Sequence, residues 1–125
     1  MNVLLDTHIL IWALENNPSL SKKARNAIIT GGNMVFVSSA SVWEISIKKS
    51  IGKLRVPDNL LEELIAHRFN LLNISAEHAQ LAGELPMIHK DPFDRMLVAQ
   101  AKIEKLTLIS NDPMIAQYEV KLLRD

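Results

Sequence analysis

The chain of 125 residues is the size of one domain, and its 14 Lys and Arg residues balance its 14 Asp and Glu residues, which argues against a uniformly basic coat for nucleic acid. The absence of cysteine excludes disulfide bonds, thiolate metal sites and cysteine nucleophiles. No stretch reaches the ~18–20 apolar residues of a membrane span and no secretory signal is visible, so we expect a cytoplasmic protein without a membrane partner.

Short apolar runs alternate with helical patterns along the chain, which indicates βαβ units. In chain order, the expected elements are a strand at 2–5, helices at 8–15 and 19–30, a strand at 34–38, helices at 40–50 and from about 58, a strand at 69–74, helices at 76–85 and 92–105, a strand at 106–110, a short helix from 113 and a strand near 120–123. We expect Ser19, Asp58 and Ser75 to be the N-caps of their helices. Right-handed crossovers then predict one three-layer α/β/α domain over residues 1–125, with a central parallel sheet of about five strands flanked by helices.

Four acidic residues occupy positions that a parallel sheet would bring to one edge. Asp6, Glu44 and Asp112 follow the first, second and fourth expected strands, and Asp94 opens the longest expected helix. Ligands of open α/β sheets bind outside the carboxyl ends of the strands, and acids that converge there repel one another unless a cation lies between them. Because carboxylate oxygens are the ligands that Mg²⁺ and Mn²⁺ prefer, the pattern favours a metal-dependent enzyme acting on phosphate.

Each of these acids also has a structural explanation, which the sequence leaves open. Asp6 is a suitable helix N-cap. Asp91 precedes a proline and is a strong cap for its helix, which places Asp94 where a negative charge suits the helix dipole. Glu44 lies three residues after Ser41, which is the spacing of a capping box. The joint placement of the acids is what favours the functional interpretation.

Four segments carry a resemblance to a known family: LLDTHILIWAL, SSASVWEISIKKSIGKL, HKDPFDRMLVAQA and LTLISNDPMI. In their order and spacing they resemble the PIN domain family, and within it the VapC-type toxin ribonucleases of toxin–antitoxin systems, across essentially the whole chain. The resemblance implies a PIN-like fold and an endoribonuclease that uses Mg²⁺ or Mn²⁺ to hydrolyse RNA phosphodiester bonds, leaving 5′-phosphate and 3′-hydroxyl ends. Position by position, the catalytic and metal-binding acids of the family fall on Asp6, Glu44, Asp94 and Asp112.

Several residues near the acids are candidates for contacting the RNA substrate. They include basic side chains close to the second and third acids, an acid of the HxDPFDR segment and a serine shortly before the fourth acid: Lys48, Lys49, Arg95, Asp91 and Ser110. His8 and His89 also lie close to acids in the sequence, and either could contact a phosphate or simply be structural.

The resemblance further implies a homodimer and a cognate VapB-like antitoxin. Apolar residues of the early helices could form the wall of an antitoxin groove or lie in the core: Ile9, Trp12, Leu14 and Leu20. Two other functions stay open. One is a non-catalytic PIN-like module that binds RNA or protein. The other is an aspartate-dependent phosphatase with Asp6 as nucleophile, which is disfavoured because His8 stands where such enzymes carry a second aspartate.

Overall fold

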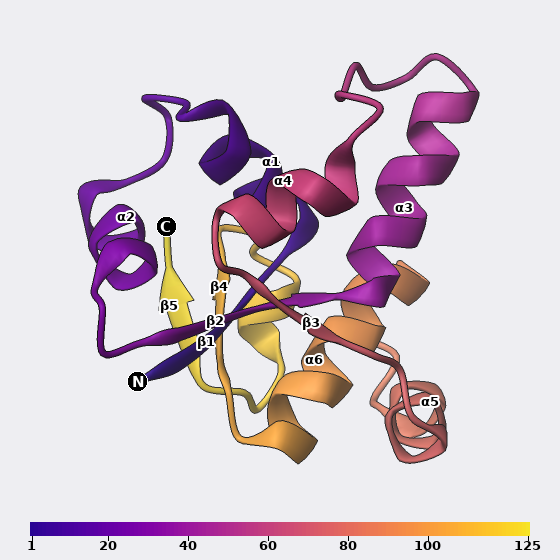
Figure 1. Cartoon of the computed structure of the whole chain (residues 1–125). Coiled ribbons are helices and arrows are strands. Elements are labelled where there is room, and N and C mark those ends of the chain that lie inside the picture. Colours follow the sequence, from indigo (N-terminus) through magenta and orange to yellow (C-terminus); the bar gives the residue numbers. More distant parts are fainter.

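A five-stranded parallel sheet forms the centre of the computed structural model, which describes residues 1–125 (Figure 1). The strands are β1 (Asn2–Leu5), β2 (Met34–Ser38), β3 (Asn70–Leu72), β4 (Thr107–Ser110) and β5 (Leu122–Arg124). Their order is β3-β2-β1-β4-β5, and Leu4 of the central strand is in register with Phe36 on one side and Leu108 on the other. This arrangement confirms the predicted α/β class with a parallel sheet of five strands.

Six α-helices and one 3₁₀ helix connect the strands. They are α1 (Thr7–Glu15), α2 (Lys22–Ile29), α3 (Ser39–Ser50), α4 (Leu60–Ala66), α5 (Ala76–Glu84), α6 (Pro92–Glu104) and the 3₁₀ helix η1 (Ile115–Gln117). None of these helices combines the length and the apolar character that crossing a lipid bilayer requires.

The two faces of the sheet bury separate hydrophobic clusters, as the alternation of side chains along a strand requires. Val3 and Leu5 point to the face that packs with α1, α2 and α4. Leu4 points to the opposite face, which packs with α5, α6 and η1. All three side chains are fully buried, and residues 3–5 of the first strand are all apolar because the strand lies in the middle of the sheet with both faces covered.

Two of the expected N-caps are wrong. Ser21, and not Ser19, caps α2, because its hydroxyl accepts a hydrogen bond from Ala24 N at 3.0 Å. The backbone N–H of Ser19 instead donates to Asn17 Oδ1 at 2.9 Å. The helix expected from Asp58 begins at Leu60 without any side-chain cap.

Other local predictions are confirmed. Ser75 caps α5 in a capping box, in which the ring of His78 accepts a hydrogen bond from Ser75 N at 3.0 Å. Asp91 caps α6, with a proline in the first turn. The short helix expected from Pro113 is the 3₁₀ helix η1. The third strand, however, differs from the expected 69–74: it starts at Asn70, since Phe69 N donates to the carbonyl of Leu64 in α4, and it ends at Leu72.

Candidate metal centre

An acidic cavity of about 550 Å³ lies at the carboxyl ends of the central strands. Its lining consists of five carboxylates, one lysine, one histidine and four other residues: Asp6, Glu44, Asp91, Asp94, Asp112, Lys48, His8, Thr7, Ile11, Asn111 and Pro113. The fold therefore brings all four predicted acids to one cavity, because β1, β2 and β4 end at the same edge and α6 begins there.

Asp6 reaches this cavity from the junction of β1 and α1. Its Oδ1 accepts a hydrogen bond from Ile9 N at 2.8 Å, so the residue is also the N-cap of α1. Burial raises the pKa of the Asp6 carboxyl, whereas the Ser110 side chain and the Ile9 amide lower it and the charge of Asp112 raises it further. Asp6 is thus held in position by its hydrogen bond to the start of α1, while burial disfavours the charged form of its carboxyl.

Glu44 enters the cavity from α3. The alternative that it forms a capping box with Ser41 is wrong. Ser38 caps this helix, with its hydroxyl accepting from Ala40 N at 3.0 Å. Glu44 Oε2 pairs with Lys48 Nζ at 2.8 Å, whereas Glu44 Oε1 is buried without a hydrogen-bond partner. A buried carboxylate oxygen without a partner is costly, so this atom needs a donor or a cation.

Asp94 lies in the first turn of α6, behind the capping Asp91. Asp91 Oδ1 accepts from Phe93 N at 2.8 Å and from Asp94 N at 3.2 Å, which leaves the Asp94 carboxylate free of any capping role. Burial and then the charge of Asp91 raise the pKa of Asp94 to about 7, although its hydrogen bond with His89 lowers it. Asp94 can therefore exchange a proton near neutral pH.

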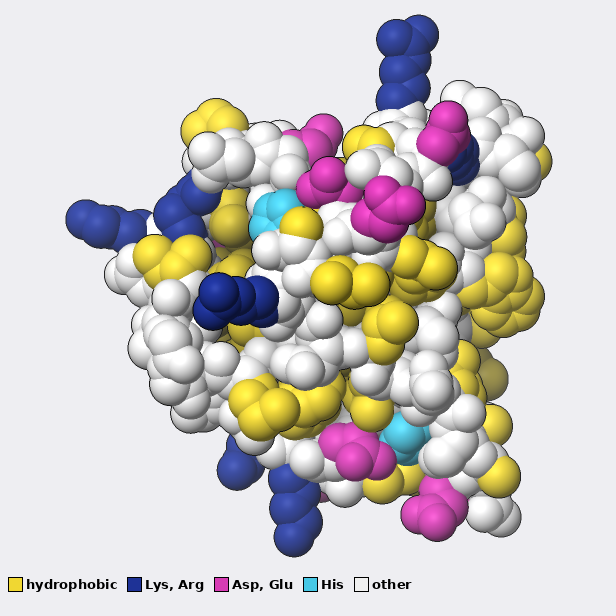
Figure 2. All heavy atoms as spheres, viewed as in Figure 1, with side chains coloured by type: hydrophobic (Ala, Val, Ile, Leu, Met, Phe, Trp, Pro, Cys, Tyr) yellow, Lys and Arg dark blue, Asp and Glu magenta, His cyan; other side chains and the backbone are white.

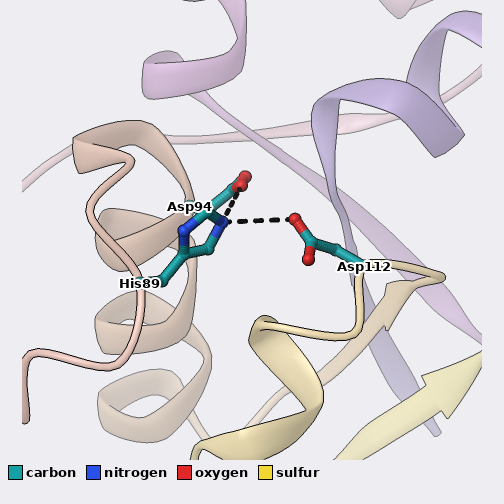
Figure 3. A group of neighbouring side chains, drawn as sticks. All are labelled: His89, Asp94 and Asp112. Carbon is teal, nitrogen blue, oxygen red and sulfur yellow. Dashed lines mark hydrogen bonds and ion pairs between the residues drawn. The ribbon is translucent and has the colours of Figure 1, made fainter.

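His89 lies between two of the acids (Figure 3). Its Nε2 is 2.9 Å from Asp94 Oδ2 and 3.2 Å from Asp112 Oδ2. Burial lowers the pKa of the His89 ring, but the hydrogen bonds and charges of Asp94 and Asp112 outweigh it and raise the pKa overall. One ligand atom from each of these three residues lies within 4.8 Å of the others, which is a spacing that could hold a metal ion. From the sequence, His89 could contact a phosphate or be structural, and its place in the HKDPFD segment was the available signal for a role in the site.

Three of the predicted substrate contacts lie outside the cavity. Lys49 pairs with Asp58 instead. Ser110 is buried in the sheet, where its hydroxyl accepts from Asp112 N at 3.0 Å. Arg95 is buried on the far side of α6, where its guanidinium donates to backbone carbonyls. Of the five candidates, only Lys48 and Asp91 line the cavity.

The apolar residues of the early helices divide between core and surface. Ile9 and Leu20 are buried in the core, whereas Trp12 and Leu14 are only partly covered. A smaller hollow of about 200 Å³ lies beside the acidic cavity, and the two share Ile11. The hollow is lined by residues of α1, α3 and α4 and the segment before α4: Ile11, Leu14, Glu15, Ile45, Arg55, Val56, Pro57, Leu60 and Glu63.

The fold and the acidic cavity define a small α/β domain with a candidate metal centre at the carboxyl edge of its sheet. The family model described as PIN domain matches residues 3–121, and the chain therefore belongs to the PIN domain family. Comparison with curated proteins finds no match to this sequence.

Solved structures of similar fold include chains of bacterial toxin–antitoxin complexes. A chain of VapBC2 from Rickettsia felis, bound to a DNA fragment from its promoter, has a TM-score of 0.74 at 19% identity, over 100% of this chain and 99% of that chain. A toxin–antitoxin complex from Klebsiella pneumoniae gives 0.67 at 21% identity, over 97% and 95% of the two chains. DNA-bound VapBC from Salmonella typhimurium gives 0.68 at 18% identity, over 99% and 98%. At these identities the likeness establishes a shared fold.

Proposed function

We propose that this PIN domain is a metal-dependent endoribonuclease, the toxin of a VapBC-type toxin–antitoxin system, and that it hydrolyses RNA phosphodiester bonds in the acidic cavity. The observation that carries the proposal is the buried, unpartnered Oε1 of Glu44 on the wall of a cavity with four further carboxylates. Several carboxylates that line one cavity repel one another, and a buried oxygen without a hydrogen-bond partner is unfavourable. A divalent cation would relieve both.

The donor set fits a hard divalent cation. Asp6, Glu44, Asp94 and Asp112 offer carboxylate oxygens, which suit Mg²⁺ or Mn²⁺ better than softer metals. We assign these four residues as the ones that would hold the metal. A bound ion of this kind supplies an activated water and neutralises charge on the phosphate.

The remaining side chains would orient and neutralise the substrate. Lys48 holds Glu44 through its ion pair and is the only lysine or arginine on the cavity wall, so it is placed to meet a phosphate oxygen. His89 keeps the Asp94 carboxylate oriented through the contact at Oδ2.

Substitution of the acids tests the assignment. Asp6→Asn and Asp94→Asn should each lower RNA cleavage in Mg²⁺ or Mn²⁺ by about 100-fold or more, with the new ends mapped by sequencing. Asp58→Asn is the matched control, because Asp58 is an exposed acid paired with Lys49 outside the cavity. Full activity in both cavity variants would refute the nuclease proposal, and metal-independent RNA binding without cleavage would favour a non-catalytic binding module.

The apolar surface supports protein partners for this toxin. Hydrophobic side chains are exposed over the region of α4 and β3 on the face shown in Figure 2. Among the residues of these two elements, Leu61, Ile65 and Leu71 are each at least half exposed. We propose that a VapB-like antitoxin segment occupies the hollow beside the acidic cavity and that the toxin forms a homodimer. Light scattering of the purified chain, alone and with the product of an adjacent antitoxin-like reading frame, tests both assemblies.

A further inference from the structure

A buried guanidinium without an acidic partner lies behind the acidic cavity. Arg95 follows Asp94 on α6 and is 7% exposed. Every ion pair in the structure involves other residues. A buried cation without a carboxylate is costly, so a residue needed only for packing here would be apolar. The charge of Arg95 therefore points to a specific role.

The Arg95 guanidinium binds the segment that leads from α5 to the cavity. Nη2 donates to Ala82 O at 2.8 Å and to Leu85 O at 2.9 Å, and Nη1 donates to Pro86 O at 3.0 Å and to His89 O at 3.3 Å. The guanidinium of arginine presents five N–H donors in one rigid plane and can therefore reach several carbonyls on a wide arc, whereas lysine has only three donors, all on one nitrogen. The residues between α5 and α6 have little regular structure of their own and depend on these bonds.

Tyr118 completes the same network from the segment after η1. Its hydroxyl accepts from Arg95 Nη1 at 3.2 Å and from His89 N at 2.9 Å, and it donates to Pro86 O at 2.9 Å. Both backbone polar groups of His89 are thus held by Arg95 and Tyr118. The ring of the same residue contacts Asp94 and Asp112 in the cavity (Figure 3).

We propose that Arg95 and Tyr118 are positioning residues, which hold the backbone of His89 so that its ring aligns the Asp94 and Asp112 carboxylates for a divalent metal ion. The inference rests on the proposed function for the metal, and it replaces the substrate contact predicted for Arg95. Carboxylates that are held before binding lose less conformational freedom when the ion binds. This clamp, formed by Arg95 and Tyr118 on the backbone of His89, therefore increases metal affinity.

Removal of one hydroxyl tests the clamp. Tyr118→Phe keeps the ring and deletes the bonds to His89, Arg95 and Pro86, and we expect it to weaken Mn²⁺ binding by about 10-fold in calorimetry. Lys102→Met is the matched control, because Lys102 Nζ ties α6 to Glu119 O at 2.9 Å, beside Tyr118, without reaching His89. That control should change the Mn²⁺ affinity by about twofold or less. Arg95→Lys keeps the charge but loses the fork, and it should weaken Mn²⁺ binding as Tyr118→Phe does.

Repeating the Tyr118→Phe measurement in a protein that lacks the His89 ring separates a positioning role from general destabilisation. In a His89→Ala protein, Tyr118→Phe should alter the Mn²⁺ affinity by only about twofold or less, because the imidazole ring through which it acts on Asp94 and Asp112 is gone. Effects of Tyr118→Phe that are equal in both backgrounds would overturn the proposal.

Amide hydrogen exchange distinguishes failure of the clamp from failure of the proposed function. The His89 N–H should exchange faster in Tyr118→Phe than in the wild type, with or without metal, because its hydrogen-bond acceptor is lost. Wild-type protein that binds no Mn²⁺ would refute the proposed function. Unchanged exchange at His89 would refute the clamp.

Discussion

The Thr7 hydroxyl donates a hydrogen bond to the Ser41 hydroxyl at 2.9 Å and thereby joins the start of α1 to the first turn of α3. Both residues are buried. Thr7 follows Asp6, and Ser41 lies one turn before Glu44, so this bond connects the two helices that carry the first two acids. It is one of the contacts that set how far apart those acids lie.

Loss of either hydroxyl should destabilise the protein. Thr7→Val and Ser41→Ala each leave a buried hydroxyl without its partner, and each should lower the free energy of unfolding by about 1–2 kcal/mol in urea denaturation. The double variant should cost less than the two single effects added together, because the residues share one bond. Ser50→Ala, at an exposed serine of α3, should change stability by about 0.5 kcal/mol or less. Strictly additive effects at Thr7 and Ser41 would contradict the coupling.

The metal-free protein should lose stability as pH rises toward neutrality. Burial and the charge of Asp91 raise the pKa of Asp94 from 3.8 to about 7, so the folded state binds more protons than the unfolded state between these values. The free energy of unfolding then falls as pH rises through this window. The raised pKa values of Asp6 and His89 act in the same direction, since a raised pKa stabilises the folded state only while the group keeps its proton.

Urea unfolding in a chelator, repeated across the same pH range, measures this effect. Asp94→Asn cannot titrate, so it should show a shallower fall in stability between about pH 4 and pH 7. An identical pH dependence in Asp94→Asn and the wild type would show that this carboxyl does not hold the extra proton.

Divalent metal should stabilise the wild type more than Glu44→Gln. At a free Mn²⁺ concentration of about 100 times Kd, binding to the folded state alone adds about 2.7 kcal/mol to the free energy of unfolding. Glu44→Gln removes one proposed ligand and should show a smaller gain at the same Mn²⁺ concentration. Glu62→Gln, on α4 and outside the acidic cavity, should keep the wild-type gain. If Mn²⁺ raised the melting temperature of Glu44→Gln as much as that of Glu62→Gln, Glu44 would not be a metal ligand.

Two adjacent lysines should differ in their effect on RNA binding. Lys48 lines the acidic cavity, whereas Lys49 pairs with Asp58 away from it. Lys48→Met should weaken RNA binding and reduce the slope of log affinity against log salt by about one, as expected for one lost phosphate contact. Lys49→Met should leave that slope unchanged. Fluorescence anisotropy at several salt concentrations measures these slopes. An equal reduction of the slope in Lys48→Met and Lys49→Met would contradict the phosphate contact proposed for Lys48.

Local chemistry was enough to predict some parts of the site and insufficient for others. Asp91 was identified as the cap of α6 because aspartate before proline satisfies the helix start without help from the rest of the fold. The cap of α2 was misplaced because Ser19 and Ser21 offer the same hydroxyl. The backbone N–H of Ser21 also donates to Asp125 Oδ1 at 2.6 Å, a contact across 104 positions that no local pattern reveals.

The directions in which neighbouring side chains point could not be predicted from the sequence either. Asp94 and Arg95 are adjacent on α6, yet successive residues of a helix point about 100° apart, so Asp94 faces the cavity and Arg95 faces the end of α5 and the loop that follows it. His89 shows the same limit, because its loop has no periodicity and its position depends on contacts with Arg95 and Tyr118.

By itself, the sequence determined the parallel α/β architecture and the edge at which the four acids collect, since apolar strand runs and right-handed crossovers allow few arrangements. The tertiary structure alone decided that Glu44 Oε1 is left without a partner, that His89 lies between Asp94 and Asp112, and that Arg95 turns away from the acidic cavity. The reason is physical: strand order follows from local patterns of burial, whereas hydrogen-bond partners depend on which distant groups the packing places within about 3 Å.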